Sequence, residues 1–264
     1  TKVENFTGLR WGNDTSISVP INGVSLAADV TTCHRSDEAG APKAQRMLVA
    51  TYTGMTIRLG FVACGGATTD ALTGEYNGPG TTEASLLGFD RVTQPAQLDR
   101  IQDFADAQGR LDAIYMSSGG NNAGFGEIIT DCINPFGPAN CADIWETELA
   151  ARLFDLIKPG GEYEEVEEAI VARFGDDLPV LIQEYPNPLH NGSTAIPPSC
   201  FGPDYDAFAE VGFGGFDDAL QDNVTHEEAN WAFDIAGLLN TAVESAAADY
   251  GWIEVDGHLS AFDG

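Results

Sequence analysis

The chain has few basic residues. Of its 264 residues, 12 are Lys or Arg and 41 are Asp or Glu, which gives a formal net charge of -29. Such a charge repels phosphate backbones and anionic membrane surfaces, so the composition argues against a nucleic-acid-binding protein. An acidic, well-solvated surface of this kind suits a salty or extracellular medium.

The sequence also lacks the usual signs of a metal centre and of a membrane span. No cysteine belongs to a Cys-x-x-Cys pair or lies at zinc spacing from a histidine, and we expect neither a metal nor a cofactor. No signal peptide and no apolar run of about 18 residues is present, so we expect no stable membrane insertion. The cysteine usage favours an oxidising, secreted setting with two disulfides and one cysteine left over. The five cysteines are Cys33, Cys64, Cys132, Cys141 and Cys200.

The main candidate for a functional turn in the sequence is the stretch Tyr115–Phe125. A short apolar run, Ala113–Met116, gives way to two serines, two glycines and two asparagines, and a helical pattern begins at Phe125. The pattern predicts a strand, a tight turn and a helix. At the carboxyl end of a strand in an α/β sheet, such a turn is placed where ligands bind, and an asparagine amide there can donate to an oxygen that develops negative charge. The same residues also form ordinary turns, so this stretch alone does not distinguish a functional turn from a structural one.

Strand and helix patterns alternate along the chain, which predicts an α/β protein with a parallel sheet and helices on both faces. The hydrophobic fraction of 43% and the length favour a single domain over 1–264, with an irregular segment at 1–32. A second glycine turn, Cys64–Thr69, follows the predicted strand 57–63. We read 73–82 as a loop and the charge run in the helix 163–174 as a solvated face. The other predicted strands are 112–117, 178–186 and 252–256, and the other predicted helices are 44–53, 94–107, 125–133, 146–157 and 227–248.

An ordered series of short motifs resembles the SGNH (GDSL-type) hydrolases, in their secreted actinobacterial lipase and esterase branch. The order and spacing of these motifs carry the resemblance, which covers most of the chain from residue 33 to its end. The resemblance implies a carboxylic-ester hydrolase that works through a serine acyl-enzyme, acting on a small-molecule or lipid ester. It also implies a three-layer α/β/α sandwich with a flavodoxin-like parallel sheet of about five strands, of which this chain supplies four. The motifs are CHRS at 33–36, ACGGATT at 63–69, QLD at 97–99, SGGNNAGF at 118–125 and VDGH at 255–258, with Phe262.

The resemblance assigns two residues to an oxyanion hole: the backbone N–H of Gly66 and the side-chain amide of Asn121. Preorganised donors of this kind are worth about 3 to 4 kcal/mol each in the transition state. The chain departs from the family pattern at Gly65, where a serine is usual, and at Asn122, where an aspartate is usual. The second departure removes a carboxylate that normally supports the turn.

The nucleophile and the base of the family are not found in the sequence. It contains neither the Gly-Asp-Ser motif nor a late His-Pro-Asn block, and the 264 residues resemble the middle of such a hydrolase. We therefore expect both catalytic groups to lie outside this chain. The resemblance also suggests the disulfides Cys33–Cys64 and Cys132–Cys141, with Cys200 unpaired.

Local substitutes are weaker candidates. Ser16 follows Gly12-Asn13-Asp14-Thr15, but no apolar strand precedes it to hold it in a strained turn. His258 lies two residues after Asp256, so that a carboxylate could orient the imidazole, although a structural role suits it better. His34, His190 and His226 are expected to have structural or solvent-facing roles.

Two other functions remain open. One is a catalytically inactive secreted protein that keeps the cleft for a glycan or acyl ligand. The other is an acidic ion-binding protein, for which the sequence offers no calcium loop.

Overall fold

The computed structural model describes residues 20–21, 24–25, 40–79, 91–133, 141–185 and 226–256. Their contacts divide into two compact units. The first contains the described residues up to Asp112 together with Glu168–Asp176, and the second contains Ala113–Glu167 and the described residues from Asp177 onward. The single domain expected from the sequence stays a prediction.

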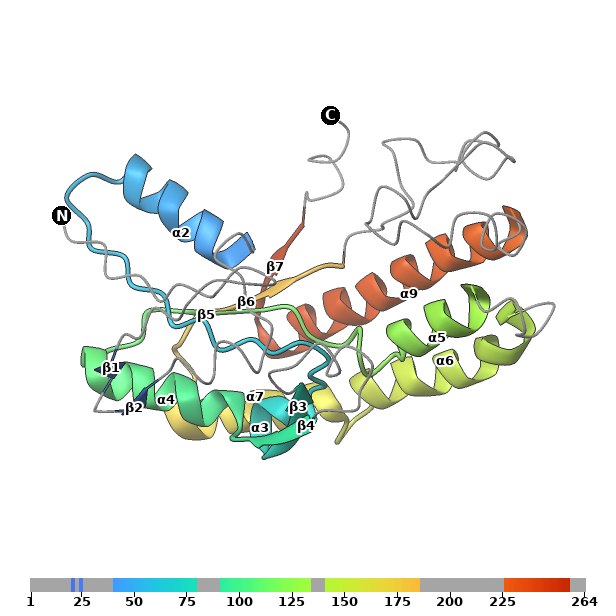
Figure 1. Cartoon of the computed structure of the whole chain (residues 1–264), viewed down its shortest axis with the longest axis horizontal. Helices are drawn as coiled ribbons and strands as arrows, with labels where there is room; N and C mark the ends of the chain where they lie inside the picture. The colour runs from blue at the N-terminus through green and yellow to red at the C-terminus, as the bar shows by residue number, and fades with distance from the viewer. Residues whose placement is uncertain are drawn as a thin grey trace. The chain divides into compact units, whose positions relative to one another are not determined.

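The second unit is built on a three-stranded parallel sheet in the order β5-β6-β7 (Figure 1). The strands are β5 (Ile114–Met116), β6 (Val180–Gln183) and β7 (Ile253–Val255). Ile114 pairs with Val180, and Leu181 pairs with Ile253. Because the strands are parallel, the turns that follow β5, β6 and β7 meet at one edge of the sheet, where α/β proteins bind ligands.

One face of this sheet is closed and the other is partly open. Ile114, Met116, Val180 and Ile182 alternate along β5 and β6 and are buried, as the period of two requires for one face. On the other face, Tyr115 and Ile253 are 48% and 51% exposed, and both pair through Leu181 in register. The predicted strands 112–117, 178–186 and 252–256 are thus found, with shorter bounds.

Helices supply the rest of the core of the second unit: α5 (Phe125–Ile133), α6 (Cys141–Ile157), the first half of α7 (Glu162–Phe174) and α9 (His226–Tyr250). α9 packs on β6 and β7, α6 packs on α9, and α5 packs on α6 (Figure 1). The predicted helices agree with these bounds, except that α6 begins five residues before the predicted 146. The buried apolar residues of these helices are Ile128, Trp145, Leu149, Leu153, Leu156, Tyr163, Val166, Ile235, Ala236, Leu239, Ala242, Val243, Ala246 and Ala247.

Among its described residues, the first unit contains two antiparallel pairs, three helices of its own and the second half of α7. The pairs are β1 (Pro20–Ile21) with β2 (Val24–Ser25), and β3 (Tyr76–Pro79) with β4 (Arg91–Gln94). The helices are α2 (Gly40–Thr51), α3 (Asp70–Thr73) and α4 (Gln97–Gln108), and the last ends at Gly109 in the left-handed conformation. The structure corrects the loop predicted over 73–82, because 76–79 pairs with β4; Pro79 at the end of β3 is compatible with an edge strand.

The strand predicted over 57–63 is wrong. That segment is extended but forms only an isolated bridge at residue 59, so the described sheet has three parallel strands and not the four expected from the sequence. Gly60 shows the physical reason. A Cβ placed there would lie 2.9 Å from the Phe104 ring of α4, so the segment crosses an aromatic side chain closely. Among the described residues, 57–63 therefore forms no strand of the parallel sheet.

Candidate functional site

The turn after β5, Ser117–Gly124, is the best-built feature at the carboxyl edge of the sheet. Successive backbone hydrogen bonds coil it into α5, from Ala123 N–H to Gly119 O at 2.9 Å and from Phe125 N–H to Gly120 O at 3.1 Å. Ser118, Gly119 and Gly120 are buried, whereas Asn121 is exposed. The predicted strand, turn and helix are therefore all present, and the turn presents the Asn121 side chain at the surface.

Two tyrosines hold the turn from below. Tyr163 lies on α7, and its hydroxyl donates to the Ser118 carbonyl oxygen at 2.7 Å. Tyr185 follows β6, and its hydroxyl accepts the Gly120 N–H at 2.9 Å. Ser117 also hydrogen-bonds to the Tyr185 hydroxyl. Burial raises the pKa of Tyr185, and these two hydrogen bonds offset part of that rise. Both tyrosines thus remain neutral phenols that fix the backbone of the turn.

The glycines of the turn are required by these contacts. A Cβ at Gly119, where φ is +114°, would lie 2.3 Å from the Tyr163 hydroxyl oxygen, and one at Gly120 would lie 2.6 Å from a Tyr185 ring carbon. At Gly124, where φ is +78°, it would lie 1.9 Å from Nη1 of Arg152. Packing therefore requires glycine at all three positions, and the left-handed backbone conformation requires it as well at Gly119 and Gly124.

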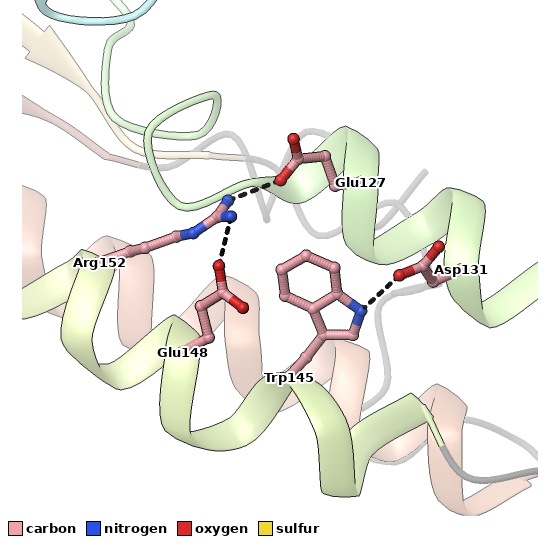
Figure 2. A network of polar contacts seen from close by, with 5 residues as sticks. All are labelled: Glu127, Asp131, Trp145, Glu148 and Arg152. Carbon is pink, nitrogen blue, oxygen red and sulfur yellow. Dashed lines mark hydrogen bonds and ion pairs between the residues drawn. The ribbon is translucent and has the colours of Figure 1, made fainter. Parts of the chain in front are cut away.

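Arg152 belongs to a polar network that joins α5 to α6 behind the turn (Figure 2). Its guanidinium donates to Glu127 at 2.9 Å and to Glu148 at 2.7 Å, and it lies 5.2 Å from the centre of the Trp145 ring. The Trp145 indole N–H donates to Asp131 at 3.1 Å. These contacts fix the start of α5, on which the end of the turn depends.

Asn122 has a partner that explains its identity. Its side-chain amide donates to the carboxylate of Glu162 at the start of α7. An aspartate at this position would instead place two carboxylates side by side, which is unfavourable. An asparagine at position 122 thus fits a turn supported by Glu162.

The charge run of α7 is more than the solvated face predicted from the sequence. Besides Glu162, the Glu167 carboxylate accepts the Trp252 indole N–H at 2.6 Å, and Glu164 accepts the Gly160 N–H at 2.6 Å. Tyr163 meets the Trp252 ring edge to face at 5.9 Å. Several of these carboxylates therefore tie α7 to its neighbours and stabilise the helix that carries Tyr163.

Sequence reasoning missed the residues that follow β6. The side chain of Asn240 in α9 accepts the Tyr185 N–H at 2.7 Å and donates to the Tyr185 carbonyl at 3.1 Å, which fixes this segment beside the turn. The alignment of parallel strand ends offered a signal, because residues that follow β6 must lie next to those that follow β5.

The buried carboxyl group of Glu184 lies at the same edge. One oxygen from each of Glu184, Glu244 and Glu254 lies within 4.8 Å of the others, and Glu184 is 8% exposed. Burial, a hydrogen bond to Glu254 and the negative charges of Glu254, Glu244 and Asp256 raise the pKa of Glu184 to about 7.

The other predicted oxyanion donor, Gly66, belongs to the first unit, whereas Asn121 belongs to the second. Gly66 has a φ of +73° in the turn closed by the bond from Ala67 N–H to Cys64 O at 3.2 Å. Cys64 is disulfide-bonded. The predicted pairings remain predictions, because Cys33 and Cys200 lie outside the described residues, as do the side chains of Cys132 and Cys141. Ser16, His34, His190 and His258 lie outside them too, as does the side chain of His226.

Comparisons with known proteins find a resemblance of fold. The chain is similar to phospholipase A1 from Streptomyces albidoflavus, with a TM-score of 0.48 and 19% identity over 85% of this chain and 69% of that one. It is also similar to the extracellular lipase from Streptomyces rimosus, with a TM-score of 0.49 and 20% identity over 84% of this chain and 68% of that one. No family model and no curated protein matches the sequence. The α/β fold with its small parallel sheet follows from the strands and helices of this chain itself. Among the described residues, no helix has the length and apolarity to cross a bilayer.

Proposed function

We propose that this chain supplies the oxyanion side of a secreted carboxylic-ester hydrolase of the lipase or esterase type. The observation that carries the proposal is the turn Ser117–Gly124, which two tyrosines hold at the carboxyl edge of a parallel sheet while Asn121 stays exposed. A donor that is fixed before the reaction needs no reorganisation when negative charge develops, and it therefore favours the transition state.

In the proposed reaction a serine hydroxyl attacks the ester carbonyl carbon, and a histidine takes the serine proton. The carbonyl oxygen becomes an oxyanion, for which the Asn121 amide and the Gly66 N–H are the proposed donors. The alcohol then leaves with the proton, and water releases the acid in a second, equivalent step. The motifs for the serine and the histidine are absent from the 264 residues, so we assign both to sequence outside this chain, in a three-layer α/β/α domain.

The first test compares this chain with a longer product of the same reading frame that contains a Gly-Asp-Ser motif and a late histidine. With p-nitrophenyl esters, the 264 residues should give no turnover above background, and the longer chain should hydrolyse the ester. Ready hydrolysis by the 264 residues alone would overturn the assignment of the nucleophile. Start and stop codons that flank these residues closely would instead favour an inactive binding protein for a glycan or acyl ligand.

The second test addresses Asn121 in the active, longer chain. Asn121→Ala should lower kcat by about 10² to 10³ with little change in KM, because the lost hydrogen bond forms with the oxyanion and not with the ground-state ester. Gln102→Ala, an exposed amide on α4, is the matched control and should leave both constants unchanged. If Asn121→Ala instead raises KM by this factor and leaves kcat unchanged, Asn121 is not an oxyanion donor.

A further inference from the structure

Helix α2 exposes its largest apolar side chains and buries a polar one. Met47 and Leu48 are 70% and 44% exposed, and Tyr52 and Met55, just beyond the helix, are 53% and 56% exposed. These four are among nine large apolar side chains exposed in the described part of the chain, and they fall within nine consecutive residues. Gln45, by contrast, is 4% exposed and donates to the Ile57 carbonyl at 3.0 Å. The helix is therefore the reverse of an ordinary surface helix.

The exposed apolar residues form a continuous run. The Tyr52 N–H donates to the Leu48 carbonyl at 2.8 Å, so that Tyr52 extends the helical turn and lies one turn beyond Leu48. The Met55 N–H donates to the Tyr52 carbonyl at 3.2 Å and holds the next residues close to the helix end. We call Met47, Leu48, Tyr52 and Met55, together with the basic residues of the same segment, the α2 patch.

The charge of this segment is opposite to that of the whole chain. Residues 39–69 contain no Asp or Glu, whereas 31 residues of average composition would hold about five, since 41 of the 264 are acidic. The same segment contains three of the 12 basic residues, Lys43, Arg46 and Arg58, and all three are exposed. Lys43 lies one helical turn before Met47, on the same side of α2. The α2 patch is thus both apolar and basic on an acidic molecule.

We propose that the α2 patch docks the chain on an anionic phospholipid surface. Flexible methionine and leucine side chains beside a tyrosine suit the boundary between headgroups and acyl chains, and Lys or Arg beside them suits lipid phosphates. A second copy of this chain fits less well, because two molecules with a formal charge of -29 repel each other. The docking is independent of the proposed hydrolysis, since it requires no turnover.

The net charge and the α2 patch act over different distances, so binding to vesicles should depend on salt concentration in a characteristic way. The Debye length is about 30 Å at 0.01 M salt and about 10 Å at 0.1 M. At low salt, the acidic residues elsewhere in the chain repel an anionic surface before the α2 patch can touch it. Near physiological salt that repulsion is screened, while charges in direct contact still attract. Binding to anionic vesicles should therefore be strongest at intermediate salt.

The test is co-sedimentation of the 264-residue chain with vesicles of phosphatidylcholine, with and without phosphatidylglycerol. We expect binding that increases with phosphatidylglycerol and peaks at intermediate salt. The double variant Met47→Ser with Leu48→Ser should weaken binding about tenfold, because it removes apolar area that enters the interface. Lys43→Gln with Arg46→Gln should weaken binding about tenfold to the vesicles that contain phosphatidylglycerol and should not change binding to phosphatidylcholine vesicles.

Matched controls come from other exposed positions. Leu238→Ser on α9, where the leucine is 54% exposed, and Arg110→Gln, where the side chain is 75% exposed, should leave binding unchanged. Melting curves for every variant confirm that the fold is retained. Absence of binding at every salt concentration, or equal binding by all variants, would overturn the proposal. Sedimentation velocity supplies a further check, since a dimer that Met47→Ser with Leu48→Ser dissociates would assign the α2 patch to a second copy of the chain.

Discussion

Glycine at position 120 is set by a neighbour and not by backbone conformation. A Cβ there would lie 2.6 Å from Cε1 and 2.9 Å from Cζ of Tyr185. The ring cannot move freely, because its hydroxyl accepts the Gly120 N–H and its backbone is held by Asn240. A single methyl group at this position therefore strains the contact between the turn and the segment after β6.

We predict that Gly120→Ala lowers the free energy of unfolding by about 1 to 3 kcal/mol, the usual cost of overpacking. Urea denaturation measures the change. Gly126→Ala is the control, since a Cβ there meets nothing within 4 Å and alanine favours the α5 helix. It should be neutral or stabilising by up to about 1 kcal/mol. Equal losses for both variants would show that the Tyr185 contact does not decide the identity of residue 120.

The link between the turn and α7 is electrostatic. Asn122 donates to Glu162, so Asn122→Asp turns a hydrogen bond into a repulsion between two carboxylates. We expect this variant to lose about 1 to 2 kcal/mol of stability at neutral pH, which urea denaturation measures.

A double-mutant cycle isolates this pair. Glu162→Gln added to Asn122→Asp restores a donor opposite an acceptor, so the double variant should be more stable than Asn122→Asp alone, with a coupling of about 1 kcal/mol. Additive losses in the cycle would mean that Asn122 and Glu162 do not interact in solution.

The buried carboxyl group of Glu184, which follows β6, should make the stability of the chain depend on pH. The pKa of Glu184 is about 7 in the folded chain, above its usual value of 4.5, first because of burial and then because of the hydrogen bond and negative charges around it. The folded state thus binds more protons than the unfolded state between these values, and the free energy of unfolding falls as pH rises from about 5 to about 8. The contribution is on the order of 1 to 2 kcal/mol, because Glu244 and Glu254 are exposed and screened.

Glu184→Gln tests this dependence, since the amide mimics the neutral acid. It should stabilise the chain at pH 8, leave it nearly unchanged at pH 5 and flatten the slope between them. Glu168→Gln, on the exposed side of α7, removes one carboxylate elsewhere and should leave the slope as it is. A slope that survives Glu184→Gln would show that other groups cause it.

Periodicity in the sequence predicted the elements well where local pattern and packing agree. Helix α5 has the expected bounds, and β5, β6 and β7 lie inside the expected ranges. The strand predicted over 57–63 was wrong because pairing requires a partner strand, which no local pattern reveals, and the residues of this apolar run are only half-buried or exposed. The strand 76–79 was missed because Gly and Pro are rare in strands, so its residues did not indicate the pairing with the next strand, 91–94.

The candidate site was predictable only in part. The residues of the turn after β5 indicated a strand, a tight turn and a helix, and the structure has these three at the expected edge of the sheet. The role of Asn121 as a donor stays a prediction. The residues that support this turn are distant along the chain, roughly 40 to 120 residues away, and no local spacing pattern predicts their contacts. They are Glu162, Tyr163, Tyr185 and Asn240. Tertiary contacts of this kind follow from the fold and not from local sequence.

The formal charge of -29 acts on the molecule as a whole. The described ion pairs use a small part of the 41 acidic side chains, for example Arg152 with Glu127 and Arg173 with Asp99. Folding brings the remaining like charges closer together than they are in the unfolded chain, and their repulsion opposes the compact state. Added salt should relieve this repulsion and raise the melting temperature of the full chain.

We predict a rise of several degrees between about 0.01 M and 0.2 M NaCl and little further rise above that concentration, because the Debye length falls from about 30 Å to below 10 Å over the first interval. Differential scanning fluorimetry at pH 7 measures the change. A general exclusion effect of salt would instead grow steadily with concentration, so the shape of the curve separates the two causes. A melting temperature that rises linearly up to 1 M NaCl would show that charge repulsion is not the main term.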